Sequence, residues 1–181
     1  MKQPLPSQSF QLLSRVKNRL IAALITGFPS LSGRFLKAFE PVENTDVPWT
    51  PVQKPLGTCR VALVTTAGVH MEGQPPFNMS DPAGDPTFRA IDGDVPSYAL
   101  TITHDYYGHS DADKDVNIVF PIDRMREFVS EGVIGSLART YYGFMGHILG
   151  HNVEELVRRY APDVAKLLLA DGVDVVLLTP A

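Results

Sequence analysis

Two mainly apolar runs, residues 60–66 (RVALVTT) and 173–179 (VDVVLLT), constrain the fold of this chain more than any other feature. A strand that is apolar throughout is typical of a parallel sheet covered by helices, because a half-exposed strand alternates with polar residues. Residues 99–103 do alternate and indicate a further strand. Residues 73–96, which are rich in proline, glycine and aspartate, predict a long irregular loop. The order of these segments predicts an α/β fold with a parallel, flavodoxin- or Rossmann-like sheet.

Two helices are expected in the second half of the chain. The first has Asp123 as its N-cap and ends at Gly132. The second has Asn152 as its N-cap, and Glu155 three residues later completes a capping box. Pro162 falls inside the apolar stripe of this second helix. Because proline lacks an N–H group, we expect it to kink the helix or to split it in two.

The first 57 residues differ in composition from the rest. Residues 1–40 carry six basic residues against one acidic residue. Their apolar side chains recur at spacings of three and four, which favours amphipathic helices over a signal peptide. Four prolines in residues 41–57 predict an extended arm. We therefore divide the chain into a helical and proline-rich N-terminal arm, residues 1–57, and an α/β domain, residues 58–181.

Composition excludes several classes of protein. With 44% apolar residues the chain is too hydrophobic for disorder, and a single cysteine cannot build a disulfide framework. A net charge of −4 argues against nucleic-acid binding, which needs a basic surface. The apolar run at residues 20–25 is far shorter than the roughly 20 residues of a membrane span. We expect a cytoplasmic protein with no membrane span and no nucleic-acid partner.

Three polar clusters are expected to follow strands or to precede a helix. The densest, residues 104–115, holds two histidines and four aspartates and could ligate a metal ion, although an acidic solvated turn has the same composition. Residues 139–147 carry two glycines, which allow backbone N–H groups to approach an anion or form a plain loop. Residues 65–70 combine small hydroxyl groups with a glycine and a histidine that could act as an acid or a base, or form a tight turn.

Several of these segments, taken together, resemble the selenoprotein B subunits of glycine/sarcosine/betaine reductase and D-proline reductase. The segments that carry the resemblance are 47–51 (VPWTP), 61–70 (VALVTTAGVH), 109–124 (HSDADKDVNIVFPIDR), 132–138 (GVIGSLA), 142–147 (YGFMGH) and 174–180 (DVVLLTP). The resemblance implies reductive cleavage of a carbon–nitrogen bond in a small amino acid or its N-methylated derivative. It also implies a partner subunit that carries a pyruvoyl group or otherwise activates the substrate, and a thioredoxin-like dithiol as the electron donor.

One departure from the family pattern concerns the nucleophile. The resemblance implies a redox-active selenocysteine or cysteine just after the strand at residues 173–179, where a soft, low-pKa chalcogen would attack the substrate. The chain reads Thr179-Pro180-Ala181 there and ends, and its Cys59 borders a strand, where a lone cysteine is usually packing material. We expect that the chain is truncated, that a selenocysteine codon (UGA) follows Ala181, and that residues 1–181 are inactive alone, with no metal or cofactor of their own.

The candidate site residues come from the three polar clusters. The candidate catalytic residues, to which the resemblance assigns no individual role, are His70, His104, His109, Asp111 and Asp113. The candidate substrate-binding residues are Thr66, Gly68, Gly143, Gly146 and His147. Two alternatives remain: a metal-dependent hydrolase built on residues 104–115, and a non-catalytic assembly subunit. The basic residues 1–40 and the acidic residues 81–131 would suit docking against partner subunits.

Overall fold

The structure is a computed structural model that describes residues 16, 17, 20 and 50–181. The chain forms two compact units, one of residues 1–53 and 105–108, and the other of residues 54–104 and 109–181. All the elements below belong to the second unit. The amphipathic helices expected within residues 1–40, and the arm up to residue 49, lie outside the described residues.

The main sheet of the second unit has five strands and is mixed. Its strands are β1 (Arg60–Thr65), β3 (Arg89–Asp92), β5 (Ser136–Leu137), β6 (Thr140–Gly143) and β7 (Val175–Thr179). Their order is β3-β6-β1-β5, and β7, which lies off this path, also pairs with β1. β1 is parallel to β5, β6 and β7, whereas β3 is antiparallel to β6. The α/β class is confirmed, and the expectation of a wholly parallel sheet is wrong for β3.

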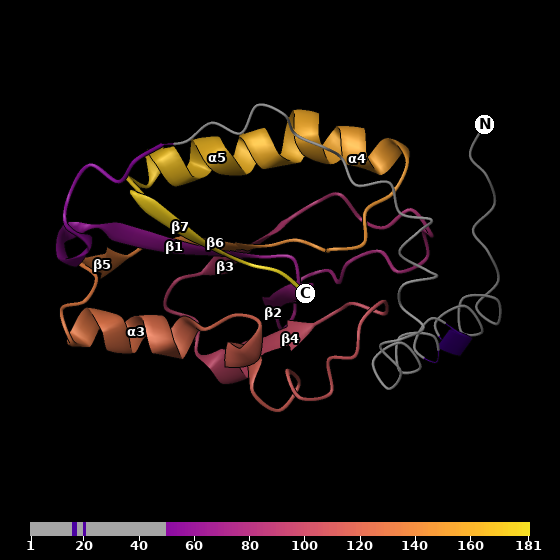
Figure 1. The fold of residues 1–181 in the computed structure, drawn as a ribbon. Coiled ribbons are helices and arrows are strands. Elements are labelled where there is room, and N and C mark those ends of the chain that lie inside the picture. The colour runs from indigo at the N-terminus through magenta and orange to yellow at the C-terminus, as the bar shows by residue number, and fades with distance from the viewer. Residues whose placement is uncertain (1–15, 18–19, 21–49) are drawn as a thin grey trace, which may run out of the picture. The chain divides into compact units, whose positions relative to one another are not determined.

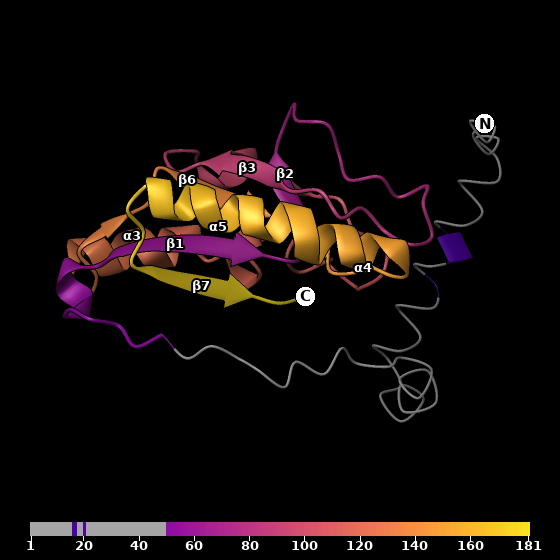
Figure 2. The same ribbon diagram turned by 90° about the horizontal axis from the view of Figure 1, so that it is seen from above.

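The two apolar runs that predicted strands have different surroundings. β1 is central, and the side chains of its Val61, Ala62 and Leu63 are buried. β7 lies at the margin of the sheet, paired with β1 in register from Val61 opposite Val175 to Thr65 opposite Thr179 (Figure 2). Its Leu177 is 40% exposed and its Leu178 is 69% exposed. The prediction of a strand is correct for both runs, but β7 is not buried, because β1 is its only neighbour among the described strands.

A second, two-stranded sheet lies on the α3 side of the main sheet (Figure 1). It pairs β2 (Val69–Met71) with β4 (Leu100–Ile102) in antiparallel register. The strand expected at residues 99–103 therefore exists but belongs to this small sheet. The irregular loop expected at residues 73–96 is interrupted by β3, so that prediction is wrong over four residues.

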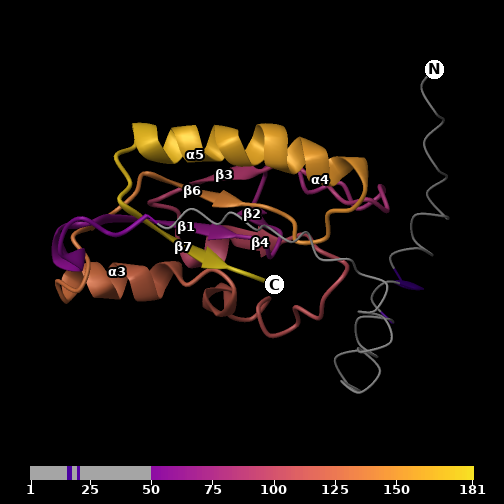
Figure 3. The ribbon, with the colours of Figure 1, turned by 45° about the horizontal axis from the view of Figure 1, so that its top comes forward.

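Helices cover the two faces of the main sheet (Figure 3). On one face lies α3 (Ile122–Ser130), and on the other lies a continuous helix made of α4 (His151–Glu155), a π-helical segment (Leu156–Tyr160) and α5 (Ala161–Ala170). The helix is not split at Pro162, because Tyr160 and Ala161 keep helical dihedral angles; Pro162 lies in the first turn of α5, directly after the π-helical segment. Short 3₁₀ turns occur at Leu56–Thr58, Ser97–Ala99 and Val116–Ile118. No helix among the described residues is long and apolar enough to cross a membrane.

Both predicted N-caps are wrong. Pro121 precedes α3, and Asp123 lies in its first turn, where its backbone N–H donates to Asn117. Gly150 precedes α4, and the Asn152 side chain instead donates to the carbonyl of Gly84 at 2.7 Å. The predicted end of α3 is correct, since Gly132 follows it with a φ of 72°, which favours glycine.

The core lies on both faces of β6. Tyr142, Phe144 and Val164 form a buried cluster beneath the long helix, against which five partly buried side chains pack: Val64, Phe88, Leu156, Tyr160 and Leu168. On the α3 face, Tyr141 packs edge-to-face against Phe120 with ring centroids 5.8 Å apart. Burial raises the pKa of Tyr141 to about 12, so its hydroxyl stays neutral. Successive side chains of β6 thus pack on opposite faces of the sheet, and each face anchors one helical layer to the strand that leads into the site.

Candidate functional site

The carboxyl ends of β1, β6 and β7 meet at one edge of the main sheet, because the three strands run in the same direction. After β1 the chain turns toward the small sheet on the α3 side, and after β6 it turns to α4 on the other face (Figure 1). In open α/β sheets, ligands bind outside the carboxyl ends of the strands where neighbouring connections leave to opposite faces. This carboxyl edge is the candidate site.

Threonine hydroxyl groups and backbone hydrogen bonds hold the strand ends together at the carboxyl edge. The hydroxyl groups of Thr65 and Thr179 both donate to the carbonyl of Val119, at 3.0 and 2.7 Å. The backbone N–H of Thr66 donates to the carbonyl of Thr179 at 3.1 Å, and that of Phe144 donates to the carbonyl of Thr65 at 2.7 Å. The ends of all three strands are thus held together by neutral groups.

Two of the predicted substrate-binding residues, Thr66 and Gly146, are brought together at this edge. The Ala181 backbone N–H donates to the Thr66 hydroxyl at 3.2 Å. A Cβ atom at Gly146 would lie 3.0 Å from the carbonyl oxygen of Ala181 and 3.2 Å from that of Thr66. Three segments that are distant in the sequence therefore approach one another by their backbones, and the absence of a side chain at Gly146 permits the approach.

The other two glycines of the predicted site meet the chain's own backbone. A Cβ at Gly68 would lie 2.5 Å from the carbonyl oxygen of Thr103, and a Cβ at Gly143 would lie 2.0 Å from that of Val69. Gly68 also has a φ of 74° and donates its N–H to Phe144 at 2.8 Å. These two positions therefore allow the small sheet to pack against the ends of β1 and β6.

His70 is buried in β2 with both ring nitrogens engaged. Its Nδ1 lies 3.0 Å from the carbonyl of Met71, and its Nε2 lies 2.8 Å from the Thr103 hydroxyl. Because a carbonyl only accepts, Nδ1 donates to Met71, and Nε2 shares a hydrogen bond with the Thr103 hydroxyl. His70 thereby positions the loop that follows β4.

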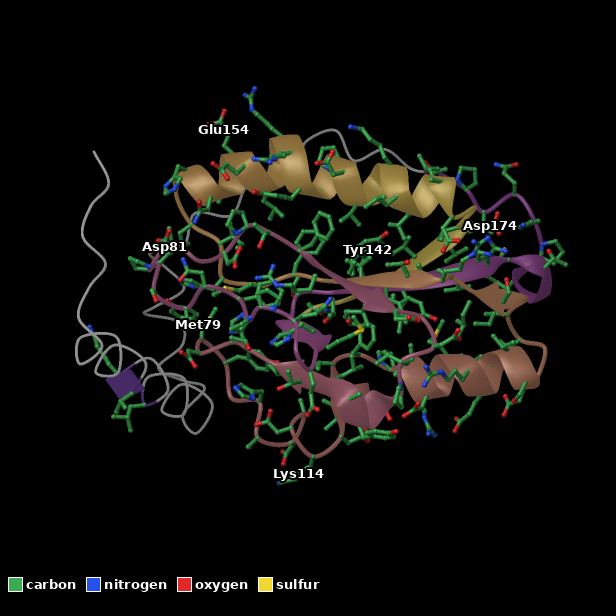
Figure 4. All side chains as sticks on the ribbon, turned by 180° about the vertical axis from the view of Figure 1, so that it is seen from behind. Met79, Asp81, Lys114, Tyr142, Glu154 and Asp174 are labelled. Atoms are coloured by element: carbon green, nitrogen blue, oxygen red, sulfur yellow. The ribbon has the colours of Figure 1, made fainter. Side chains whose placement is uncertain are left out.

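Two pairs of side chains in the cluster at 104–115 form within the loop itself. His109 Nδ1 lies 2.8 Å from Asp113, and Lys114 donates to Asp111 at 2.8 Å. That hydrogen bond and the lysine charge lower the pKa of Asp111. His104 is buried beside the end of β4. Across the described residues, no three His, Cys, Asp or Glu side chains come together as a metal-binding group. Figure 4 shows Lys114 pointing away from the main sheet, on the side opposite Glu154 of α4.

His147 holds a second loop against the carboxyl edge. Its Nε2 donates to the carbonyl of Pro82 at 3.1 Å, and the backbone N–H of Leu149 donates to that of Ala83 at 2.8 Å. A Cβ at Gly84 would lie only 1.7 Å from the carbonyl oxygen of His147. The Asn152 side chain bonds the same loop, so the segment after β6 and residues 82–84 form one wall.

An aspartate–arginine pair orders this loop, and sequence reasoning did not find it. Burial raises the pKa of Asp85, but hydrogen bonds from Thr87 and Asn78 together with the charge of Arg89 outweigh it and hold the pKa below its ordinary value. Arg89 lies 3.4 Å from Asp85 and stacks over the Phe77 ring at 4.3 Å. The only local signal is an aspartate two residues before a threonine, a common turn pattern.

Comparison with known proteins places these observations in a family. The model of the family described as glycine/sarcosine/betaine reductase selenoprotein B matches residues 17–181. D-proline reductase subunit gamma from Acetoanaerobium sticklandii is 44% identical over 131 residues, which are 72% of this chain and 52% of that protein. Glycine reductase complex component B subunit gamma from Carboxydothermus hydrogenoformans is 34% identical over 135 residues, 74% of this chain and 30% of that protein.

A third relative extends the range of named substrates. Sarcosine reductase complex component B subunit beta from Peptoclostridium acidaminophilum is 32% identical over 135 residues, 74% of this chain and 30% of that protein. The chain thus spans about half the length of the D-proline reductase subunit and under a third of the other two. No solved structure matches the chain. The resemblance seen in the sequence is confirmed.

Proposed function

The chain belongs to the glycine/sarcosine/betaine reductase selenoprotein B family, and from that premise we propose that it is a subunit of an amino-acid reductase. The reaction is the reductive cleavage of a carbon–nitrogen bond in an amino acid or its N-methylated derivative. Curated relatives are named for D-proline, glycine and sarcosine, which supports this class of substrate.

The observation that carries the proposal is the convergence of Thr66, Gly146 and Ala181 at the carboxyl edge. The Thr66 hydroxyl lies 3.2 Å from the Ala181 N–H, and Gly146 leaves room for the Ala181 carbonyl. A residue that follows Ala181 would emerge beside these groups. We assign the family's selenocysteine or cysteine to that place, where it supplies a soft anionic nucleophile.

The chain's own residues bind and orient the substrate in this proposal. Thr66 and the backbone around Gly146 face the reacting position, and His147 holds the neighbouring wall. The remaining candidates act from behind this layer or from the loop after β4: Gly68, His70, His104, His109, Asp111, Asp113 and Gly143. The only thiol, Cys59, is buried, which supports the expectation that residues 1–181 do not turn over alone.

The proposal includes partners that relatives' names support only in outline, since those proteins are components of reductase complexes. A partner subunit carries a pyruvoyl group that activates the substrate. A thioredoxin-like dithiol supplies two electrons and two protons: one carbon–nitrogen bond breaks, the carbon gains a hydrogen, the amine leaves with the second proton, and the dithiol becomes a disulfide.

The test uses the natural gene, including the nucleotides after the Ala181 codon, expressed with its partner subunits. We expect a UGA or cysteine codon there, followed by an open frame, and dithiol-dependent amine release from glycine, sarcosine or betaine, or ring opening of D-proline. Thr66→Val removes the hydroxyl at the reacting edge and is expected to lower kcat about tenfold, the effect of one hydrogen bond.

Thr58→Val is the matched control, because its hydroxyl donates to the Pro55 carbonyl at 2.8 Å at the opposite end of β1. It is expected to leave kcat unchanged. Another codon after Ala181 would contradict the assigned position of the nucleophile. Equal kcat values for the two variants would contradict the role of the carboxyl edge, and inertness toward all four substrates would contradict the reductase.

A further inference from the structure

A groove of about 340 Å³ runs along the small sheet, away from the carboxyl edge. One wall is the outer side of β4 together with Tyr98, and the other wall is the loop at residues 112–116. Both walls belong to the same compact unit. The groove is not lined by Thr66, Gly146 or Ala181, although Asp113 of its wall is one of the candidates that the proposed function places in the loop after β4.

The outer side of β4 offers backbone groups to the groove. In an antiparallel pair, alternate residues bond the partner strand and the residues between them point outward. The N–H of Thr103 donates to the carbonyl of Gly68, and the N–H of Glu72 donates to the carbonyl of Ala99. Thr101 lies midway between these two bonds and opposite His70, so its backbone groups point toward β2. The N–H and C=O of Ile102 therefore point outward. The N–H of Leu100 is used by Ser97, which leaves its C=O for the groove.

The opposite wall is acidic and held in place by its own hydrogen bonds. Asp113 lies 2.8 Å from His109 Nδ1, and Asp111 is bonded to Lys114. The Asp115 side chain accepts the N–H of Asn117 and so caps the turn at Val116–Ile118. Two carboxylates, of Asp113 and Asp115, line this wall together with the Lys114 ammonium group, which is already paired with Asp111. Residues 81–131 as a whole hold eleven acidic residues against four basic ones.

We propose that this groove binds an extended, lysine- or arginine-bearing segment of another polypeptide, which adds to β4 as a third strand. The backbone of such a segment supplies an acceptor for the Ile102 N–H and donors for the carbonyls of Leu100 and Ile102. Its basic side chains meet the wall that contains Asp113 and Asp115. The Tyr98 ring, 85% exposed at the end of the groove, offers a face for a cation.

Charge complementarity selects this occupant. A second copy of the chain would bring a net charge of −4 to an acidic wall. Small anions would meet the same repulsion, and an apolar peptide would leave the carboxylates without a counter-charge. A basic strand satisfies the backbone edge and the acidic wall at the same time.

Hydrogen exchange of two neighbouring amides tests the proposal directly. The probe is a fluorescein-labelled peptide of alternating lysine and valine, about six residues long, which spans roughly 20 Å when extended. In the full chain we expect the Ile102 amide to exchange at least tenfold more slowly when the peptide is bound, since one hydrogen bond protects it. The Thr101 amide is the internal control, because it already bonds His70 and should not change.

Affinity measured by fluorescence anisotropy supplies the second readout. Ile102→Pro removes the outward N–H without breaking the β2–β4 ladder, and we expect it to weaken binding about tenfold. Ile102→Val keeps the N–H and should bind as the natural chain does. Lys114→Ala makes the wall more acidic and should tighten binding, and salt near 1 M should weaken it.

Several outcomes would overturn the proposal. These are the absence of binding at about 1 mM peptide, equal binding of a peptide methylated on its backbone amides, or equal binding of a peptide with glutamate in place of lysine. If deleting residues 1–40 alone speeds exchange at Ile102, the occupant is the chain's own basic segment and not a separate polypeptide.

Discussion

The two ends of β1 are held by different kinds of interaction. At the amino end, Asp171 lies 3.6 Å from Arg60 and 3.5 Å from Arg139, whose backbone N–H it also accepts at 2.7 Å. Asp174 accepts the backbone N–H of Arg60 at 2.7 Å and pairs with Lys54 at 2.7 Å. At the carboxyl end, threonine hydroxyl groups and backbone contacts replace charged pairs.

This difference separates two tasks within one sheet. Charged side chains at the amino end fix the register of β1 against β6 and β7, far from the candidate site. At the carboxyl end, small neutral residues let three backbones approach closely. Among the described residues, no charged side chain is used there to hold the strands together, so a charged ligand meets no competing charge. Charged groups used there for structure would compete with a charged substrate for the same space.

The largest expected effect on stability is at the carboxyl end. Gly143→Ala would place a Cβ 2.0 Å from the Val69 carbonyl oxygen, and neither backbone can yield without moving the small sheet. We expect a loss of about 3 kcal/mol in the free energy of unfolding, measured by urea denaturation. Gly146→Ala is the graded comparison, because its Cβ would be 3.0 Å from the Ala181 carbonyl oxygen, a tight contact that should cost less than that at Gly143. Equal midpoints for Gly143→Ala and the natural chain would refute the close approach.

The next effect is at the amino end. Asp171→Ala removes a carboxylate that is 14% exposed and bonds Arg60 and Arg139, and we expect a loss of about 2 kcal/mol. Because Arg60 of β1 and Arg139, which precedes β6, would lose their shared anchor, hydrogen exchange should rise first near the amino ends of β1 and β6. If exchange instead rises at Thr66 and Thr179, the division of tasks between the two ends is wrong.

A smaller, pH-dependent effect is expected for the loop beside the carboxyl edge. The folded-state pKa of Asp85 lies below its unfolded value of 3.8, so its carboxylate stabilises the fold above that pH, and the contribution is lost as the pH falls through the folded pKa. Asp85→Asn should therefore cost about 1 kcal/mol near pH 7 and progressively less below about pH 4. Parallel stability curves for the two proteins from neutral to acid pH would show that Asp85 has no such role.

The smallest effect concerns an exposed ion pair near the carboxyl end. Glu154 and Arg158 are 3.0 Å apart on the helix surface, with side chains 68% and 77% exposed. Glu154→Gln should cost about 0.3 kcal/mol, and that cost should vanish near 1 M salt. A cost as large as that of Asp171→Ala would mean that charge matters equally at both ends.

The sequence predicted those parts of the fold that rest on local patterns. The apolar runs located β1 and β7, whereas Pro162 does not split the long helix, since it lies in the first turn of α5, where its missing N–H is tolerated. β3 could not be predicted, because only Ile91 of its four residues is buried and its partner β6 is about 50 residues away. The local pattern predicts Asn152 as an N-cap. Its side chain bonds Gly84 instead, and a contact between residues so distant in the chain leaves no pattern in the neighbouring sequence.

The candidate site was predictable as a set of residues but not as an arrangement. Thr66 and Gly146 are neighbours only because β1 and β6 are aligned and β7 brings Ala181 between them. The pairing of His109 with Asp113 follows from their spacing of four and needs no distant strand. The Asp85–Arg89 pair could be predicted only from the path of the loop, and the spacing of residues in the sequence does not indicate that path.

The marginal position of β7 has a consequence for handling the protein in solution. No described strand pairs with its outer side, and its leucines are open on both faces. Such a strand is a template on which other chains add, so residues 1–181 expressed alone are expected to self-associate as concentration rises. Dilute, cooled samples monitored by light scattering are therefore the appropriate starting material. The extent of self-association then reports whether the outer side of β7 is covered by another chain.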